Sequence, residues 1–552
     1  MGRHSSAVPK KTRTTRTRAE RRPVYLAIAG LLVLSLAAVL LVRTFGPESA
    51  ADGLGGRKCG ERRQVQLSTT PEIKPLLDAA AKSLAGKDDP SACVAFAITA
   101  AASAVVAKNV ASGKDGRPDL WVPDSSLWVG QADDGQQVPI VAVPSIASSP
   151  LVLVGRSDNF VDTSSWLAML SKAEPALLDP LSQTPGALAL LAIQAERQKT
   201  AATDYQVAEV VVPTAQRLGS MAKPYTDVTG LFNRAAQAGS RLVVPAAERS
   251  FVRYQDEHPD SELKAAAPGT GTLLLDYPLV VTAQNEVEAV TEAGKALASE
   301  LIANSADQDR EEAGLRDALA SELSGGSGVG VISQLPKFTG PAVAEALAEW
   351  TRLSLSANSL AVVDVSGSMA ELVGSKTRLQ LTVEAAASGL KLFPDNASVG
   401  LWTFSTKIGR YGADFNQLVP MGKLSPRQRQ KLTASLAVQQ PIKGGSTGLY
   451  DTAIAAVQMV RTNYDPSAVN AVLLFTDGRN EDPGSPTLAK TLQTLRGLRD
   501  AARPVRIIAF GMGPDADATE LRMLAEATGG QAYLTKSPAD LKSVFLAALQ
   551  SR

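Results

Sequence analysis

Oxygen-bearing side chains stand at three points in the C-terminal third of this 552-residue chain. Asp364, Ser366 and Ser368 alternate directly after an apolar run, Thr447 follows two glycines and a serine, and Asp477 comes shortly after another apolar run. Magnesium prefers six oxygen ligands in near-octahedral geometry and accepts water and hydroxyl oxygens among them. The residue types at these three points therefore suit a divalent-cation site, provided that the fold brings them together.

The elements around these residues predict how they meet. Short runs that are apolar on both faces alternate with amphipathic helical patterns such as 378–392 and 488–502. Strands buried on both faces are typical of doubly wound, mostly parallel α/β sheets, in which ligands bind beyond the carboxyl ends of the strands. The loops after Val363, around Thr447 and after Phe475 are therefore the predicted site. The runs predicted as strands are Leu360–Val363, Val399–Phe404, Ala471–Phe475 and Val505–Phe510.

Three motifs in this region resemble those of von Willebrand factor A (VWA) domains. Residues 364–368 (DVSGS) match the DxSxS signature of the family's metal-ion-dependent adhesion site, residues 444–451 (GGSTGLYD) match its Gly-Gly-Thr loop with one extra serine, and residues 475–478 (FTDG) supply its last aspartate. We expect Gly367 to allow close approach of the backbone. The DxSxS signature alone is weak, because a polar surface turn can carry it, but three motifs in the family's order favour the resemblance.

The resemblance implies a Rossmann-like VWA fold with a metal site. In the family pattern Ser366, Ser368 and Thr447 contact the cation directly, whereas Asp364 and Asp477 act mostly through water. The cation would be Mg²⁺, or else Mn²⁺ or Ca²⁺, and it would keep a strong pull on anions. An Asp or Glu side chain of a protein partner could then complete its coordination. A complete site of this kind can also be purely structural.

Other titratable residues offer little chemistry. The chain has two histidines, His4 and His258, so a Ser-His-Asp triad, a Cys-His dyad or a histidine-rich zinc site has no base or ligand to spare. We therefore predict no catalytic residues. Lys407, Glu481 and Asp482 lie in loops near the three motifs, where they could tune the choice of partner or could be solvated loop charges.

The N-terminal segment predicts a membrane anchor. Residues 1–22 hold eight Lys or Arg against one Glu, a net charge of +7, whereas the whole chain carries +1, so the other 530 residues carry −6 and nucleic acid is not an expected partner. Residues 24–42 are an uncharged apolar run of 19 residues, long enough as a helix to cross a bilayer. The positive-inside rule keeps the N-terminus cytoplasmic and the bulk of the chain outside the cell membrane, in a single pass. A cleaved signal peptide is the alternative.

The two cysteines, Cys59 and Cys93, both follow the predicted anchor, where an oxidising environment permits a disulfide. One disulfide between them would close a loop of about 35 residues and stabilise the start of the first domain by about 3 to 4 kcal/mol. Two free buried thiols are the alternative.

The length and the Gly-rich segments predict two folded domains outside the membrane. The first alternates strands such as 140–143 and 151–154 with helices such as 74–85 and 286–302. The predicted parts are a basic tail at 1–22, an anchor at 23–43, a linker at 44–58, a first domain at 59–323, a linker at 324–356 and a VWA domain at 357–552.

The first domain resembles type II periplasmic solute-binding proteins, especially those that precede a VWA domain in envelope proteins of high-GC Gram-positive bacteria. The resemblance implies two α/β lobes around a ligand cleft that the chain crosses twice. Ser125 and Ser126 could offer hydroxyl and amide groups to an anionic ligand, but plain helix capping is the alternative, and the cleft could be kept only as a scaffold. The segments that carry the likeness are 118–128 (PDLWVPDSSLW), 148–154 (SSPLVLV), 179–192 (DPLSQTPGALALLA), 243–255 (VVPAAERSFVRYQ) and 268–281 (PGTGTLLLDYPLVV).

Together these features predict a membrane-anchored, extracytoplasmic binding protein that is not an enzyme. The VWA domain would capture a protein partner through a metal-bridged carboxylate, and the first domain would sense a ligand or act as a spacer. The alternative is a receptor for a small solute or peptide, linked to transport or sensing, with the VWA domain as an assembly scaffold. A hydrolase is the least favoured class, because nothing in the sequence indicates a catalytic base.

Overall fold

The computed structural model describes residues 63–87, 93–113, 116–133, 135, 138–221, 223–303, 307–338, 340–391, 393–512 and 517–535. The predicted basic tail, membrane anchor and first linker lie outside these ranges, as does Cys59. No helix within these ranges is long and apolar enough to cross a membrane.

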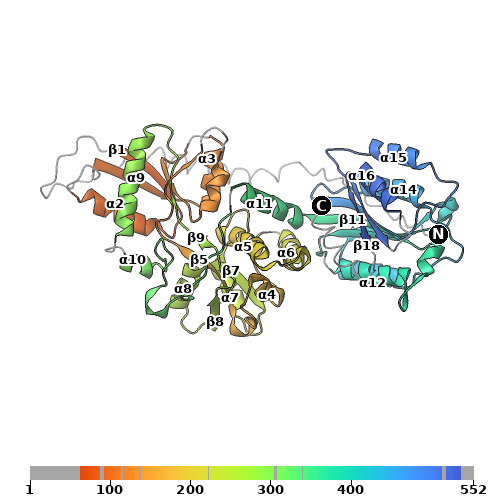
Figure 1. Cartoon of the computed structure of the whole chain (residues 1–552), viewed down its shortest axis with the longest axis horizontal. Helices are drawn as coiled ribbons and strands as arrows, with labels where there is room; N and C mark the ends of the chain where they lie inside the picture. Colours follow the sequence, from red (N-terminus) through yellow and green to blue (C-terminus); the bar gives the residue numbers. More distant parts are fainter. Residues whose placement is uncertain are drawn as a thin grey trace, which may run out of the picture. The chain divides into compact units, whose positions relative to one another are not determined.

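The first domain begins with an α/β lobe whose five strands form one sheet. The elements that belong to it are β1 (Arg63–Thr69), α2 (Lys74–Ala85), β2 (Val94–Ala100), α3 (Ser103–Ala111), β3 (Leu120–Val122), η2 (Ser126–Trp128), η3 (Gly130–Ala132), β4 (Ile140–Val143), β10 (Leu279–Val281) and α9 (Val287–Ile302). The strand order is β2-β1-β3-β10-β4, in which β1 is parallel to β2 and β3, and β10 is antiparallel to both of its neighbours. Helices α2 and α9 pack against each other beside this sheet (Figure 1).

A second α/β lobe is built by the chain between β4 and β10. Its elements are β5 (Ser149–Arg156), η4 (Ser157–Asn159), α4 (Trp166–Ser171), β6 (Glu174–Pro175), α5 (Thr184–Thr200), α6 (Asp204–Gly219), α7 (Val228–Ala235), β7 (Leu242–Ala247), α8 (Glu248–Glu257), β8 (Leu263–Ala266) and β9 (Leu274–Leu275). The sheet order is β6-β7-β5-β8, and β9 also pairs with β5. The chain therefore passes between the two sheets twice, once from β4 to β5 and once from β9 to β10, as the resemblance predicts.

Several predicted elements of this domain are confirmed. The strand at 140–143 and the helix at 74–85 have the predicted bounds, and the strand at 151–154 lies inside β5. The helix expected at 286–302 begins one residue later, because Glu286 has the left-handed backbone conformation (φ 52°) and cannot continue a right-handed helix.

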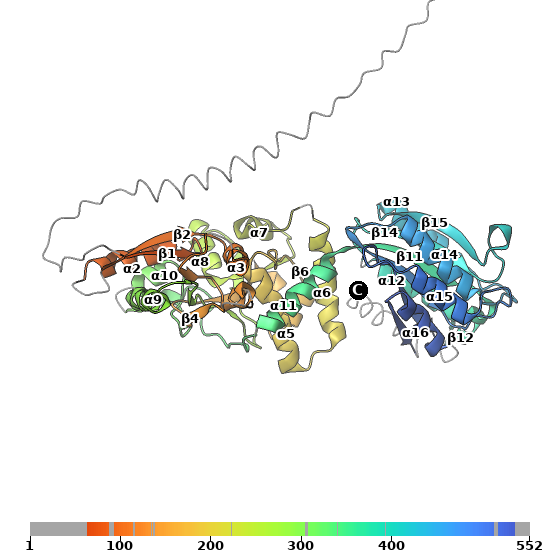
Figure 2. The same cartoon turned by 90° about the horizontal axis from the view of Figure 1, so that it is seen from above.

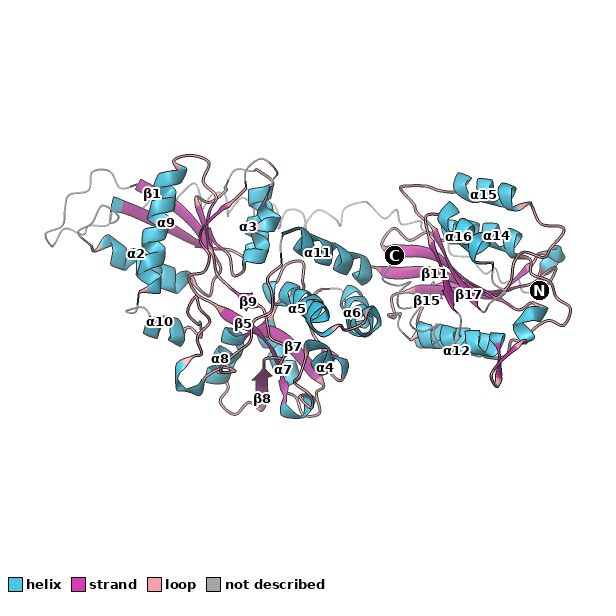
Figure 3. Cartoon of the chain, in the orientation of Figure 1, coloured by secondary structure: helices cyan, strands magenta, loops and turns pink. Residues whose placement is uncertain are grey.

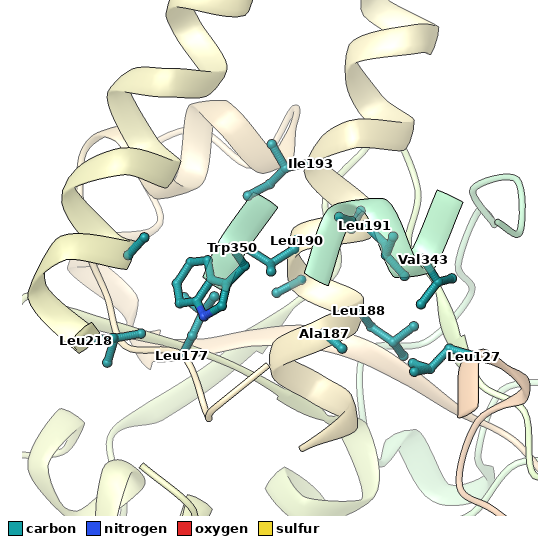
Figure 4. Packing of buried hydrophobic residues seen from close by; sticks show 14 of the residues in the cluster. Leu127, Leu177, Ala187, Leu188, Leu190, Leu191, Ile193, Leu218, Val343 and Trp350 are labelled. Atoms are coloured by element: carbon teal, nitrogen blue, oxygen red, sulfur yellow. The ribbon is translucent and has the colours of Figure 1, made fainter. Parts of the chain in front are cut away.

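The segment predicted as a linker at 324–356 is more ordered than expected. After η6 (Ser324–Gly326) it contains helix α11 (Gly340–Ser354), whose buried side chains pack on α5 and α6. Figure 4 shows Trp350 beside Leu190, and Val343 beside Leu191. The segment predicted as a linker thus contains a packed helix at 340–354. The apolar side chains of α11 recur on one helix face and gain free energy by burial against α5 and α6. Helix α10 (Asp307–Glu312) precedes this segment.

The C-terminal domain is a six-stranded sheet in the order β15-β14-β11-β16-β17-β18. All neighbouring strands are parallel except the edge strand β15. Its elements are β11 (Ser356–Asp364), η7 (Gly367–Ala370), β12 (Leu372–Val373), β13 (Lys376–Thr377), α12 (Arg378–Leu390), β14 (Ser398–Phe404), η8 (Arg410–Gly412), β15 (Phe415–Lys423), α13 (Pro426–Ala437), α14 (Leu449–Thr462), β16 (Ala468–Thr476), α15 (Leu488–Gly497), β17 (Arg506–Met512), α16 (Ala518–Ala527) and β18 (Gln531–Thr535).

Helices cover both faces of this sheet, so the domain has two apolar cores (Figure 3). On one face, side chains of α14, α15 and α16 pack against Leu360, Val472 and Ile507 of the sheet. On the other face, side chains of α12 and α13 pack against Val363 and Leu473. Helix α14 lies beside α15 on its face of the sheet (Figure 2). The four predicted strands correspond to β11, β14, β16 and β17, and the prediction of a doubly wound, mostly parallel sheet is confirmed.

Candidate functional site

The sheet brings two of the predicted metal-site loops together. Strands β11 and β16 are neighbouring and parallel, with Val363 opposite Phe475, so both chains leave the sheet at the same edge. Asp364 ends β11, and Asp477 directly follows β16. Both carboxylates are fully buried. The register of one strand pair therefore sets the distance between two side chains that are more than 100 residues apart in sequence.

Hydrogen bonds connect the DxSxS loop to Asp477. The backbone N–H of Ser366 donates to Asp364 Oδ1 at 2.8 Å, and Thr476 Oγ1 donates to Asp364 Oδ2 at 2.6 Å. The hydroxyl oxygens of Ser366 and Ser368 lie 3.1 Å apart, and Ser368 Oγ donates to Asp477 Oδ1 at 2.8 Å. The Asp364 carboxylate thus stabilises the turn through the N–H of Ser366, and the turn brings the hydroxyls of Ser366 and Ser368 together.

Thr447 lies in a third loop that is tied to the other two. The backbone N–H of Gly367 donates to the carbonyl of Gly445 at 2.8 Å, and the N–H of Glu481 donates to the carbonyl of Thr447 at 2.8 Å. A Cβ placed on Gly478 would lie 3.4 Å from Thr447 Oγ1, so this hydroxyl reaches the loop that carries Asp477. The structure therefore brings all five predicted residues into one group of loops.

The oxygen atoms of this group fit a small divalent cation. An octahedral site with metal–oxygen distances of about 2.1 Å has neighbouring ligand oxygens about 3.0 Å apart, and the Ser366 and Ser368 hydroxyls are separated by 3.1 Å. Hydroxyl and carboxylate oxygens are ligands that Mg²⁺, Mn²⁺ and Ca²⁺ accept. Ser366, Ser368 and Thr447 could hold the ion directly, with Asp364 and Asp477 around them.

Burial sets the electrostatics of Asp364. Loss of solvent raises the pKa of this carboxyl to about 7, and the nearby Asp477 adds to the increase, although hydrogen bonds from Ser366 and Thr476 oppose it. A buried carboxylate without a nearby cation is costly. A dication bound at the serine hydroxyls would favour the ionised form, so the site is electrostatically suited to a positive charge.

Arg378 is a member of this site that the sequence analysis missed. It is the first residue of α12, and its Nη1 lies 2.9 Å from Asp477 Oδ2. The capping box formed by Thr377 and Gln380 indicates only that the helix starts at Arg378. No local pattern indicates the contact with Asp477. An arginine in the first turn of a helix is unusual, since that end favours negative charge.

The expectation for Gly367 is not supported. A Cβ at this position would lie 3.4 Å from the Gly445 carbonyl oxygen, which is an ordinary contact. The closer approach is at Gly448, where a Cβ would lie 2.4 Å from Asp414 Oδ2. Close backbone packing in this group of loops thus requires glycine at 448 rather than at 367.

An acidic cluster lies near the Thr447 loop. The carboxylates of Asp414, Asp451 and Asp482 have oxygen atoms within 4.8 Å of one another. Burial raises the pKa of Asp414, and the neighbouring charges of Asp482 and Asp451 raise it further. The N–H of Lys407 donates to Asp414 Oδ1 at 2.8 Å. Of the loop residues noted in the sequence, Asp482 therefore belongs to this cluster and Lys407 contacts it.

In the first domain, the Ser125 hydroxyl oxygen already accepts a hydrogen bond, and both donors of Ser126 already have partners. Ser125 Oγ accepts from the N–H of Leu127 and caps η2. The N–H and hydroxyl of Ser126 donate to the two carboxylate oxygens of Asp276 at 2.7 and 2.8 Å, and Lys337 Nζ lies 2.6 Å from the same carboxylate. An anionic solute at Ser126 would have to displace this internal carboxylate.

The residues around Asp124 show features that are common at binding sites. Burial and the nearby charge of Glu72 raise the pKa of Asp124 to about 6. Tyr277 is buried with φ 36°, a strained conformation for a residue with a side chain, and its N–H contacts the carbonyl of Asp124. Among the described residues, neither the Tyr277 hydroxyl nor the buried hydroxyl of Thr70 has a hydrogen-bond partner. Unpaired buried hydroxyls of this kind call for a solute or water.

Cys93 is disulfide-bonded. Cys59, the other cysteine of the chain, lies outside the described residues. The predicted pairing of the two cysteines is therefore not described directly.

Comparisons with known proteins agree with the two-domain organisation. Residues 65–316 match the family model for bacterial extracellular solute-binding proteins, and residues 358–534 match the model for von Willebrand factor type A domains. The chain is 25% identical over 547 residues to an uncharacterized protein of Mycobacterium tuberculosis, found in strains CDC 1551 and H37Rv, with 92% of this chain and 79% of that protein covered.

Two solved structures illustrate the separate likenesses. A von Willebrand factor type A protein from Catenulispora acidiphila is 22% identical, with 35% of this chain and 42% of that chain covered and a TM-score of 0.29. A periplasmic thiamin-binding protein is 15% identical, with 55% of this chain and 99% of that chain covered and a TM-score of 0.40. The chain therefore contains a region similar to bacterial extracellular solute-binding proteins, followed by a region similar to von Willebrand factor type A domains.

Proposed function

We propose that this protein is a membrane-anchored, extracytoplasmic binding protein. Its VWA domain binds a divalent cation and captures a protein partner through a carboxylate that completes the coordination of the ion. The first domain senses a ligand or spaces the VWA domain from the membrane. The observation that carries the proposal is the chain of contacts from Asp364 through Ser366 and Ser368 to Asp477, with Thr447 in the adjoining loop.

The roles of the residues follow from their contacts. Asp364 fixes the turn that presents the Ser366 and Ser368 hydroxyls. Neutral hydroxyl ligands compensate little of the charge of a dication. When bound, the ion supplies an open coordination position for an anionic oxygen.

The membrane anchor is supported by the sequence alone. The uncharged run at 24–42 follows a basic tail, and this order favours a cytoplasmic N-terminus with both folded domains outside. A disulfide at Cys93 fits an oxidising compartment.

The proposal predicts that capture of a partner depends on the metal. We expect proteins of the cell envelope to bind the immobilised full-length chain in Mg²⁺ and to be released by EDTA, and an identified partner to lose at least tenfold in affinity for the Asp364→Ala variant. Surface plasmon resonance on the purified partner measures both effects. A partner whose affinity is the same in EDTA and with the variant would exclude the metal-bridge mechanism.

A second candidate function is that of a solute receptor. The family match at 65–316 and the unpaired hydroxyls of Thr70 and Tyr277 favour it. We then expect a small solute to raise the melting temperature of the full-length chain in EDTA, because binding to the folded state alone is stabilising. Loss of that shift in the Tyr277→Phe variant would place the solute at this hydroxyl, and a shift that needs divalent ions would argue against a separate solute site.

A further inference from the structure

Arg378 occupies a helix position that is unfavourable for a positively charged side chain. It is the first residue of α12, and the N-terminal end of a helix carries partial positive charge, which disfavours a cation there. Its side chain is only 6% exposed, although arginine is rarely buried without a partner. The reason for its position must therefore lie in the groups that the guanidinium contacts.

Among those groups are two carboxylates of very different exposure. Arg378 Nη1 lies 2.9 Å from Asp477 Oδ2, and Nη2 lies 2.5 Å from Glu371 Oε2. The Asp477 side chain is fully buried, whereas that of Glu371 is 59% exposed. An exposed ion pair contributes little, so the contact with Asp477 is the stronger one.

Asp477 is shared between Arg378 and the hydroxyl group of the candidate metal site. One carboxylate oxygen of Asp477 accepts from Ser368 Oγ at 2.8 Å, and the other faces the guanidinium. The backbone adds to this arrangement, because the N–H of Arg378 donates to the carbonyl of Glu371 at 2.9 Å. The contact of Arg378 with Oδ2 thereby helps to hold the Asp477 carboxylate so that Oδ1 stays beside the Ser368 hydroxyl.

We propose that Arg378 is a positioning residue of the metal site, which cancels the charge of Asp477 and so leaves a bound dication with one more uncompensated positive charge for an acidic partner. This inference rests on the proposed function. Asp364 and Asp477 alone would balance a dication. Because Asp477 pairs with Arg378, part of that compensation is withdrawn from the ion. The site then binds the ion less tightly by itself and attracts a carboxylate more strongly.

The test is calorimetric titration of Mg²⁺ and Mn²⁺ into the full-length chain and three variants. Arg378→Gln removes the charge and is expected to tighten binding of the ion by about tenfold or more, because one unit charge several ångströms away in a protein has at least that effect. Arg378→Lys keeps the charge, and Glu371→Gln keeps the Asp477 contact, so both are expected to stay within about threefold of the wild type. A residue that only holds Asp477 in place predicts the opposite sign for Arg378→Gln, namely weaker binding.

Each outcome decides the inference. Binding by Arg378→Gln that is equal to or weaker than that of the wild type would overturn it. If this variant is unfolded without metal because Asp477 is left unpaired, saturating Mg²⁺ must restore the folded state, and failure to do so would also overturn the inference. If the wild type takes up no ion at all, the proposed function fails instead, so the two failures are distinguishable.

Discussion

Replacing Asp364 with alanine is expected to weaken binding of Mg²⁺ by the full-length chain roughly 100-fold, the upper end of what loss of a supporting ligand costs. The Asp364 carboxylate is fully buried and holds both the N–H of Ser366 and the hydroxyl of Thr476. Its removal takes away one of two negative charges and releases the turn that presents the serines. Calorimetric titration measures the change in affinity.

The matched control for this prediction is Asp482→Asn. Asp482 is an acidic residue of the neighbouring cluster and makes no contact with Ser366 or Ser368 among the hydrogen bonds of the described residues. We expect its replacement to change the Mg²⁺ affinity by less than threefold. The reverse pattern, with Asp482→Asn abolishing binding and Asp364→Ala leaving it intact, would show that the acidic cluster holds the ion.

Replacing Arg316 with methionine is expected to lower the free energy of unfolding of the first domain by about 3 to 5 kcal/mol, because it leaves a buried carboxylate unpaired. Arg316 and Glu248 form a two-pronged ion pair, with both nitrogen–oxygen distances at 2.6 Å and both side chains fully buried. Glu248 also accepts from the N–H of Val329, so the pair fastens the chain beyond Arg316 to α8. Urea unfolding followed by tryptophan fluorescence measures the loss.

Two further variants show whether the ion pair is responsible for the loss in Arg316→Met. The double variant Arg316→Met, Glu248→Gln carries no unpaired buried charge, so it should recover a large part of the stability. Arg253→Gln breaks the exposed pair with Glu257 on the same helix and should cost less than about 1 kcal/mol. A loss below about 1 kcal/mol for Arg316→Met itself would mean that the pair contributes little to the fold.

The sequence predicted much of the C-terminal domain because its strands are buried on both faces. Runs such as 471–475 are uniformly apolar, and this pattern is typical of a parallel sheet covered by helices. Asp364 directly follows one such run and Asp477 comes two residues after another, so both residues are predicted at one edge of the sheet. Register, which decides that Val363 lies opposite Phe475, could not be predicted, because it depends on side-chain packing between segments far apart in sequence.

Contacts between polar residues that are far apart in the chain could not be predicted from the sequence. The sequence makes Ser126 a candidate anion-binding residue, with helix capping as the alternative. Its donors instead meet Asp276, which lies 150 residues away, and no local pattern indicates that pairing. The same holds for Arg378 and Asp477. Helix α11 could have been predicted, because its buried residues at 343, 346, 350 and 353 have helical spacing. The Gly-rich segment before it led instead to the prediction of a linker over 324–356.

The central claim concerns the position of a cation. The most direct measurement is anomalous diffraction at the manganese edge from crystals of the protein grown with Mn²⁺. The proposed site predicts one strong peak at about 2.1 Å from the hydroxyl oxygens of Ser366, Ser368 and Thr447, and its loss in Asp364→Ala. No peak in this group of loops, or a peak held instead by Asp414, Asp451 and Asp482, would contradict the account.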